Sequence, residues 1–270
     1  MSFSNVKGGA RKLNTGYEMP YVGLGIAQID GADAVEIAVR AALESGYRAF
    51  DTAQLYGNEA ELGAALKFGL TRADVFITTK VPVKNDEPQD VATRRIVGEA
   101  LKKLQVEYID LVLVHYPRDR VLGKDDDPVN KPNRIATYLA EAGLKTPAVN
   151  QCEFQPYFTR NQLRQYCHEK GILFEAFSSL CWGNQEVLNE PAVQKLVEKY
   201  NTTPQTVLYA FALNATPEKV AIIPRCDKPA YAAVNIKSAD LVFSADEYKQ
   251  LEALNRDKIF CPGCECLDVV

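Results

Sequence analysis

The 270-residue chain is poor in residues and patterns that several classes of protein require. It has only two histidines, His115 and His168, so a metal site built on imidazole ligands is not predicted. Its net charge of -4 provides no basic surface for nucleic acid or for an anionic membrane. No apolar run is long enough to span a bilayer, and no secretory signal precedes the first strand. We therefore expect a cytoplasmic protein.

The chain also lacks a linker or a low-complexity segment, which favours one domain over residues 1–270. With 47% hydrophobic residues, it can bury a large core. Four of its seven cysteines are scattered, which is typical of reduced thiols rather than of a disulfide framework: Cys152, Cys167, Cys181 and Cys226. The other three form the tail CPGCEC, which we expect to be oxidisable rather than metal-binding: Cys261, Cys264 and Cys266.

Strand and helix patterns alternate along the chain. After a hairpin, ARKLNTGYEMP, seven apolar runs predict strands: YVGLGI, YRAFDTA, DVFITTK, IDLVLVHY, PAVNQCEF, ILFEAFSS and KVAIIPR. Helical periodicity lies between them, as in DAVEIAVRAALESG and in the stretch with Val97, Leu101 and Leu104. A last helix, SADEYKQLEALN, follows the seventh run and opens with a capping box. Strand-helix units with short connections predict a parallel sheet with helices outside it.

The carboxyl ends of three successive apolar runs carry reactive side chains. Asp51 and Tyr56 follow the first, FITTK ends in Lys80, and LVLVHYP contains His115. In neighbouring parallel strands these ends meet at one edge, so we expect the four side chains to share a cleft. An ammonium stabilises a phenolate, and a carboxylate keeps the ammonium charged. With a histidine to orient a carbonyl, the set suits protonation of an oxygen as hydride reaches its carbon.

A closed barrel explains these strand ends better than an open dinucleotide-binding sheet. Such a sheet would carry Gly-x-Gly-x-x-Gly after its first strand, and YVGLGIAQIDG offers only Gly23 and Gly25 of that fingerprint. In a barrel, by contrast, the catalytic groups come from the ends of several different strands. We therefore predict an α/β fold of the TIM barrel type.

Five motifs, in order and over most of the chain, make it resemble the aldo-keto reductases: GYRAFDTAQLYGNE, FITTK, LVLVHYP, AVNQCEF and IIPR. That family consists of NADP-dependent carbonyl reductases on a (β/α)8 barrel. The resemblance implies an oxidoreductase with Tyr56 as proton donor, Lys80 and Asp51 as its supporting pair, and His115 as the substrate-orienting group. We expect a monomer that acts on a small-molecule carbonyl substrate.

The same resemblance implies residues that bind NADP. Gln151 matches the residue that bonds the nicotinamide carboxamide, and Phe177 matches the aromatic ring that stacks on the nicotinamide. Ser178 and Leu180 match the loop that covers the pyrophosphate. Three residues match the adenosine-phosphate end: Arg225, Cys226 and Asn235.

The chain departs from the family pattern in two respects. Cys226 replaces a serine, Tyr231 an arginine and Val234 a glutamate, which leaves Arg225 as the cation for a 2′-phosphate. In addition, a strand that ends in Gly-Val-Ser-Asn and its helix are absent before AVNQCEF. This loss of about 30 residues, or one strand-helix unit, predicts a barrel of seven units with a seam between LVLVHY and PAVNQC.

Three functions remain open at this point. The first is NADPH-dependent reduction of aldehydes or ketones, impaired by loss of the segment that would hold the carboxamide opposite Gln151. The second is a catalytically defective, reductase-like protein that retains the cofactor cleft. The third is a Schiff-base aldolase-type barrel with Lys80 as nucleophile. The carbonyl substrate is not specified; three aromatic residues are candidate pocket walls: Tyr116, Trp182 and Phe260.

Overall fold

The computed structural model describes residues 2–84, 86–116 and 146–261. Within them, all seven predicted parallel strands are present, in two sheets. The four-stranded sheet has the order β3 (Gly23–Gly25), β4 (Ala49–Asp51), β5 (Phe76–Val81) and β6 (Leu111–Val114). The three-stranded sheet has the order β7 (Val149–Glu153), β8 (Leu173–Phe177) and β9 (Ala221–Ile222). Neighbouring strands within each sheet pair in parallel.

The two sheets meet along one side, between β9 and β3. There the Gly25 amide donates to Pro224 O at 3.1 Å, and the Ile222 amide donates to Tyr21 O at 2.8 Å. A Cβ at Gly25 would lie 2.8 Å from the carbonyl oxygen of Ile223, so this close approach requires glycine. The strands therefore form a ring that is continuous across this side.

On the other side of the ring, β6 and β7 share no backbone hydrogen bond among the residues that the structure describes. This is the position at which the sequence predicts a seam. Residues 117–145 lie outside the described residues, so the loss of one strand-helix unit stays a prediction.

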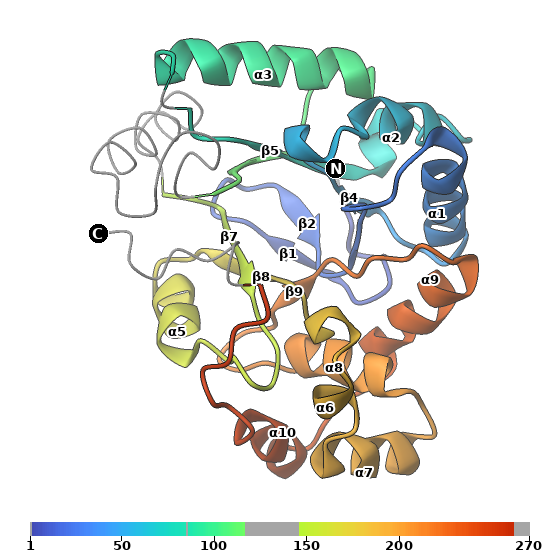
Figure 1. The fold of residues 1–270 in the computed structure, drawn as a ribbon, viewed down its shortest axis with the longest axis vertical. Helices are drawn as coiled ribbons and strands as arrows, with labels where there is room; N and C mark the ends of the chain where they lie inside the picture. The colour runs from blue at the N-terminus through green and yellow to red at the C-terminus, as the bar shows by residue number, and fades with distance from the viewer. Residues whose placement is uncertain (1, 85, 117–145, 262–270) are drawn as a thin grey trace.

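Helices lie outside the strands (Figure 1). Those around the ring are α1 (Ala32–Glu44), α2 (Glu59–Ala65), α3 (Gln89–Leu104), α5 (Asn161–Glu169), α8 (Pro204–Leu213) and α9 (Pro229–Asn235). The other described helices are α6 (Gln185–Leu188), α7 (Pro191–Tyr200) and α10 (Ala245–Glu252). Short 3-10 turns complete the described part: η1 (Gln54–Tyr56), η2 (Arg72–Asp74), η3 (Cys181–Gly183) and η4 (Ile236–Asp240). None of the described helices could cross a membrane.

The helix faces mostly follow the sequence pattern. In α1 the predicted stripe of Val35, Ala38, Val39 and Ala42 is buried, and α10 begins with the predicted capping box of Ser244 and Glu247. The predicted stripe of α3 is wrong in part. Its buried face consists mainly of Ala92, Thr93, Ile96, Ala100 and Leu104, whereas Val97 and Leu101 are only partly buried. The true face repeats every four residues back from Leu104, so Val97 and Leu101 lie at its edge.

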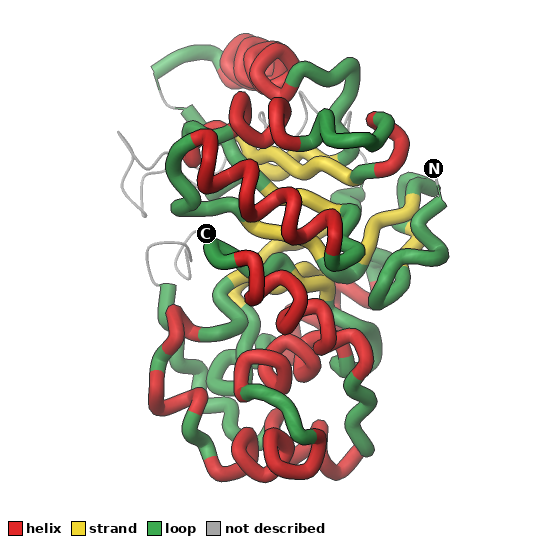
Figure 2. The backbone as a smooth tube through the Cα atoms, turned by 90° about the vertical axis from the view of Figure 1, so that its right-hand side faces the viewer, coloured by secondary structure: helices red, strands yellow, loops and turns green. Residues whose placement is uncertain are grey.

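An antiparallel hairpin closes the amino end of the ring. Its strands are β1 (Ala10–Lys12) and β2 (Glu18–Pro20), and it projects beyond the barrel strands (Figure 2). Phe3, Leu13 and Met19 form a buried cluster with one residue from each of six barrel strands: Ala49, Phe76, Leu111, Val149, Leu173 and Ala221. Because this end is filled, the carboxyl ends of the strands are left to form a site.

Candidate active site

The four predicted catalytic residues come together at the carboxyl ends of β4, β5 and β6. Lys80 is 2% exposed and Asp51 is 3% exposed, and they form a buried ion pair. The Lys80 ammonium also donates to Tyr56 Oη at 3.2 Å and to Thr52 O at 2.9 Å. The ring of His115 meets the ring of Tyr56 edge-on, with centroids 5.5 Å apart. The sequence therefore identified one contiguous cluster.

The charges in this cluster determine its protonation. Burial raises the pKa of the Tyr56 phenol above 10.0, and the positive charge of Lys80 opposes that rise. Burial alone would lower the pKa of Lys80, but the charge of Asp51 and the Tyr56 oxygen outweigh it, so the pKa of Lys80 is raised. At neutral pH the site thus holds a neutral phenol beside a firmly protonated ammonium.

The loop that carries Tyr56 is fixed by a buried amide. Asn58 donates through Nδ2 to Ile26 O at 2.9 Å and to Ile29 O at 3.1 Å, and it accepts from the Thr52 hydroxyl at 3.0 Å. Gly57 follows Tyr56 with φ of 71°, a left-handed conformation that suits glycine. The Tyr-Gly-Asn sequence therefore builds a rigid turn, although sequence reasoning gave Asn58 no role.

Gln151 reaches the same cluster from β7. Its Nε2 donates to Asp51 Oδ2 at 2.9 Å and to Glu175 Oε2 at 2.8 Å. Glu175 is 2% exposed and lies opposite Gln151 in the register of β7 and β8. Sequence reasoning missed Glu175. The available signal was a lone carboxylate inside the apolar run ILFEAFSS.

Three further residues predicted to bind NADP lie at the end of β8. Phe177 ends that strand, and Ser178 and Leu180 follow it, all three partly exposed. The segment has an unusual backbone, because Ser178, Cys181 and Trp182 have φ of 53°, 51° and 58°. Non-glycine residues in this left-handed region are uncommon and occur often at functional sites.

The residues predicted at the adenosine-phosphate end separate into two environments. Arg225 is exposed, and its guanidinium donates to Gln28 Oε1 at 2.8 Å. Cys226 and Asn235 are buried, with Asn235 Nδ2 3.4 Å from Cys226 Sγ. Burial raises the pKa of the Cys226 thiol to about 11. The structure therefore presents Arg225 to solvent and buries the other two against each other.

The candidate pocket walls and the cysteines have mixed positions. Tyr116 stacks on His115 with ring centroids 4.3 Å apart, Trp182 is 59% exposed, and Phe260 stacks on Tyr157 at 6.4 Å. Three of the four scattered cysteines are free thiols, as predicted: Cys167, Cys181 and Cys226. The Cys152 thiol donates to Asn150 Oδ1 at 3.3 Å. Cys261 is disulfide-bonded, and Cys264 and Cys266 lie outside the described residues.

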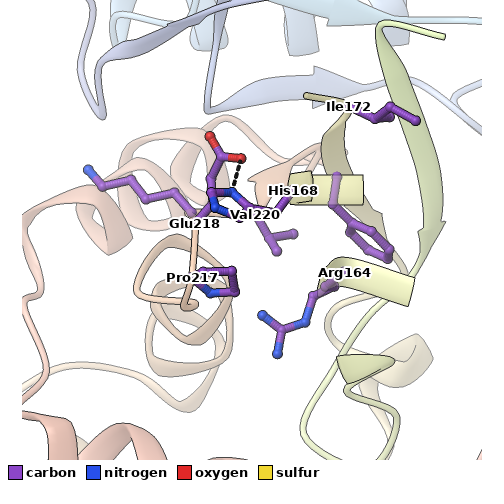
Figure 3. Close-up of a pocket in the computed structure, with 8 residues that line it drawn as sticks. Arg164, His168, Ile172, Pro217, Glu218 and Val220 are labelled. Carbon is purple, nitrogen blue, oxygen red and sulfur yellow. Dashed lines mark hydrogen bonds and ion pairs between the residues drawn. The ribbon is translucent and has the colours of Figure 1, made fainter. Parts of the chain in front are cut away.

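A small cavity of about 10 Å³ lies at the opposite end of the ring, near the starts of β8 and β9 (Figure 3). Its polar groups are already paired, since Glu218 contacts His168 Nδ1 at 3.4 Å and forms an ion pair with Arg11. Arg164 donates to Thr216 O at 2.9 Å and to three further oxygens. A space of this size holds about one water molecule, so it is not a substrate site.

Comparison with known proteins agrees with this geometry. The model of the aldo/keto reductase family matches residues 13–121 and 130–256. Glyoxal reductase of Bacillus subtilis (strain 168) is 31% identical, with 93% of this chain and 95% of the relative covered. Aldo-keto reductase family 1 member A1 of Sus scrofa is 32% identical, with 92% and 90% covered. The crystal structure of MGS-M4, an aldo-keto reductase from a Medee basin deep-sea metagenome library, superposes with a TM-score of 0.78 at 28% identity, covering 92% of this chain and 96% of that one.

The alignment with the Sus scrofa protein runs over 297 positions, more than the 270 residues of this chain, so that relative has residues without a counterpart here. The family match is interrupted at residues 122–129, which lie outside the described residues. The predicted barrel fold and the predicted enzyme class are both confirmed. The chain belongs to the aldo/keto reductase family.

Proposed function

We propose that this protein reduces aldehydes or ketones to alcohols with NADPH, and that Tyr56 donates the proton. The observation that carries the proposal is the Lys80 ammonium, held by Asp51 and placed 3.2 Å from Tyr56 Oη. NADPH, when bound, supplies the hydride that reaches the carbonyl carbon. Similarity to a glyoxal reductase supports a small aldehyde as substrate.

The proton moves from Tyr56 Oη to the carbonyl oxygen of the substrate. Because its pKa is raised by burial, Tyr56 keeps its proton until that oxygen gains negative charge. Lys80 then stabilises the phenolate that forms, and Asp51 keeps Lys80 charged and aimed. His115, in edge contact with the Tyr56 ring, orients the carbonyl oxygen.

The residues present fit NADP. The Gln151 amide nitrogen is committed to two carboxylates, which leaves its oxygen to accept from a carboxamide. Phe177 offers a partly exposed ring at the end of β8, followed by the left-handed segment that contains Ser178. Arg225 is an exposed guanidinium suited to a 2′-phosphate. We propose that Cys226 and Asn235, along with Leu180, support these segments rather than contact the phosphate themselves.

The structure argues against Lys80 as a Schiff-base nucleophile. An ammonium has three N–H donors, and those of Lys80 go to Asp51, Thr52 O and Tyr56 Oη. Its pKa is raised by Asp51 and Tyr56, which outweigh the effect of burial, whereas a nucleophilic lysine must lose its proton near neutral pH. The aldolase-type hypothesis is therefore the weakest of the three.

A catalytically defective protein stays the second candidate because of the seam. His115 directly follows β6, and Gln151 lies on β7. Both residues therefore lie beside the seam, where β6 and β7 share no hydrogen bond among the described residues. Loss of support there would loosen the site without removing the cation at Arg225. Hydride transfer would then suffer more than binding, because a misplacement of about 1 Å costs about 10²-fold in rate.

One pair of measurements separates the candidates. NADPH binding to the purified protein is followed by calorimetry, and turnover is followed by NADPH absorbance with glyoxal and with a ketone as substrates. Binding with turnover supports the reductase, and binding without turnover supports the defective protein. No binding would refute both. That the protein is a cytoplasmic monomer with a single domain over residues 1–270 stays part of the proposal.

A further inference from the structure

One carboxylate inside the ring takes no part in the chemistry proposed above. Glu175 lies on β8, in register with Gln151 on β7 and Ala221 on β9, and it is 2% exposed. Interiors of parallel barrels are filled mainly by branched apolar side chains. A buried carboxylate destabilises a fold unless it is paired, so Glu175 is expected to have a role that offsets this cost.

The contact that Glu175 makes determines which way the Gln151 amide faces. Nε2 of Gln151 has two hydrogens, and the two carboxylate oxygens of Asp51 and Glu175 lie 2.9 Å and 2.8 Å from it. Turning the amide over would place its oxygen against both carboxylates. The only atom of this amide left for a ligand is therefore Oε1, which is an acceptor.

The charges that face Glu175 are Asp51 on β4 and Lys80 on β5, and its neighbour on β9 is apolar. Lys80 forms its ion pair with Asp51, and Glu175 has no ion pair with any described residue. Burial, and then the charge of Asp51, raise the pKa of Glu175 to about 7, against the lowering effects of Gln151 and Lys80. Glu175 therefore gains a proton more readily than an exposed carboxylate does.

We propose that Glu175 is a positioning residue: together with Asp51, it holds the Gln151 amide so that Oε1 accepts a hydrogen bond from the nicotinamide carboxamide. The inference rests on the proposed function, because it requires a nicotinamide cofactor. When Glu175 gains a proton, it becomes a donor as well as an acceptor, and one reason for the amide to keep its orientation is lost. Recognition of the carboxamide is therefore strongest when Glu175 is ionised.

The test compares two oxidised cofactors by calorimetry. The first is NADP, and the second is its 3-acetylpyridine analogue, in which a methyl ketone replaces the carboxamide and offers no N–H donor. Both carry the 2′-phosphate, so its titration cancels in the ratio of the two dissociation constants. At about pH 8.5 we expect the protein to bind NADP about five- to tenfold more tightly, the worth of one hydrogen bond. The ratio should be smaller at about pH 6, below the pKa of Glu175, because one of the two carboxylates that hold the amide has then gained a proton.

Substitution assigns this preference to residue 175. Glu175→Gln should reduce the ratio at the higher pH and remove its pH dependence, because a neutral amide cannot enforce one orientation. Gln151→Leu should bring the ratio near one at both pH values. The exposed Glu44→Gln, on α1, is the matched control and should behave as the unaltered protein does.

The outcomes separate the inference from the proposed function. If the ratio does not change with pH in the unaltered protein, the inference is overturned and the proposed function is not. This measurement does not depend on whether a variant folds. An unchanged ratio in Glu175→Gln also overturns it, while binding of NADP itself leaves the proposed function standing. Absence of NADP binding at every pH would overturn both.

Discussion

The ammonium of Lys80 lies 3.2 Å from the phenol oxygen of Tyr56, and the same ammonium is anchored by Asp51 inside the barrel. The contact has opposite effects on the two protonation states of the phenol. Burial favours the neutral phenol, so Tyr56 holds its proton at rest. Lys80 favours the phenolate, so it lowers the cost of giving that proton away. Two predictions test the two halves of this arrangement.

Tyr56→Phe should abolish carbonyl reduction and leave NADPH affinity nearly intact. The substitution removes the proton donor but keeps the ring that meets His115. General acid catalysis is worth about 10² to 10⁴ in rate, so turnover should fall at least that far. The matched control is Tyr17→Phe, at a site that is 67% exposed, which should leave turnover unchanged. Full activity in Tyr56→Phe would remove Tyr56 from the mechanism.

Lys80→Met should reduce turnover by about 10²-fold or more and raise the pKa of Tyr56 further, because the opposing positive charge is gone. The high-pH limb of the rate profile should therefore move to higher pH. Stability should fall as well, since Asp51 is left as an unpaired buried charge, a loss of about 3–5 kcal/mol.

Two further variants isolate the role of Lys80 from folding. Adding Asp51→Asn to Lys80→Met removes the unpaired charge and should recover part of the stability without recovering turnover. Lys249→Met, at an exposed position of α10, controls for loss of a lysine. If Lys80→Met weakened only substrate affinity, the lysine would be a binding group and the assignment would fail.

The sequence predicted the strands well because their signal is local. Each of the seven runs is apolar and bounded by turn residues, and the carboxyl ends of three successive runs carry the predicted catalytic side chains. Asp51, Tyr56, Lys80 and His115 could therefore be grouped without coordinates, since parallel neighbours place these ends together. The phase of α3 was harder to predict, because a stripe with Val97 and Leu101 has almost the same period as the true one.

The features of the site that the sequence did not predict depend on how deeply a side chain is buried and on contacts between residues far apart in the sequence. The motif match placed Cys226 and Asn235 beside the adenosine phosphate, but it could not show that both side chains are buried against each other. Glu175 was overlooked because it interrupts an apolar run by only one residue. Its role depends on Gln151, which is 24 positions away in the sequence and also binds Asp51, 100 positions from Gln151.

Arg225→Ala should weaken NADPH binding by about 1.5–3 kcal/mol, the worth of a hydrogen bond to a charged group, and should leave NADH binding unchanged. The reason is that the exposed guanidinium is proposed to contact the 2′-phosphate, which only NADPH carries. Calorimetry with both cofactors measures the effect. Arg94→Ala, on the exposed side of α3, is the control for loss of an arginine. Equal losses for the two cofactors would contradict a 2′-phosphate contact.

Gly63 and Gly98 form a matched pair within the packed helices α2 and α3. A Cβ at Gly63 would lie 2.4 Å from Leu104 O, whereas a Cβ at Gly98 meets no atom within 4 Å. Gly98→Ala should stabilise the protein by about 0.5–1 kcal/mol through helix propensity. Gly63→Ala should instead destabilise it by about 1–3 kcal/mol, because backbone must move. Urea denaturation measures both, and equal effects would mean that α2 and α3 do not pack as described.

Glu175→Gln should change how the stability of the cofactor-free protein depends on pH. In the folded protein the pKa of Glu175 is about 7, raised by burial and by Asp51, and in the unfolded chain it returns to about 4.3. Between these values the folded state binds more protons than the unfolded state, so the contribution of Glu175 to the free energy of unfolding falls as pH rises. In the variant, residue 175 does not titrate, so its contribution to the free energy of unfolding does not change with pH. Its Tm relative to the unaltered protein should therefore increase from about pH 5 to about pH 7.5.

A second carboxylate gives the opposite sign and serves as the control. Hydrogen bonding to Lys258, together with the charges of Lys258 and Arg256, lowers the pKa of Glu186. That group stabilises the fold above its unfolded pKa and loses the contribution as pH falls, so Glu186→Gln should be relatively least stable at neutral pH. Differential scanning calorimetry at several pH values measures both variants. If Glu175→Gln followed the same trend as Glu186→Gln, Glu175 would be an ordinary ionised carboxylate, and its titration near neutral pH would be refuted.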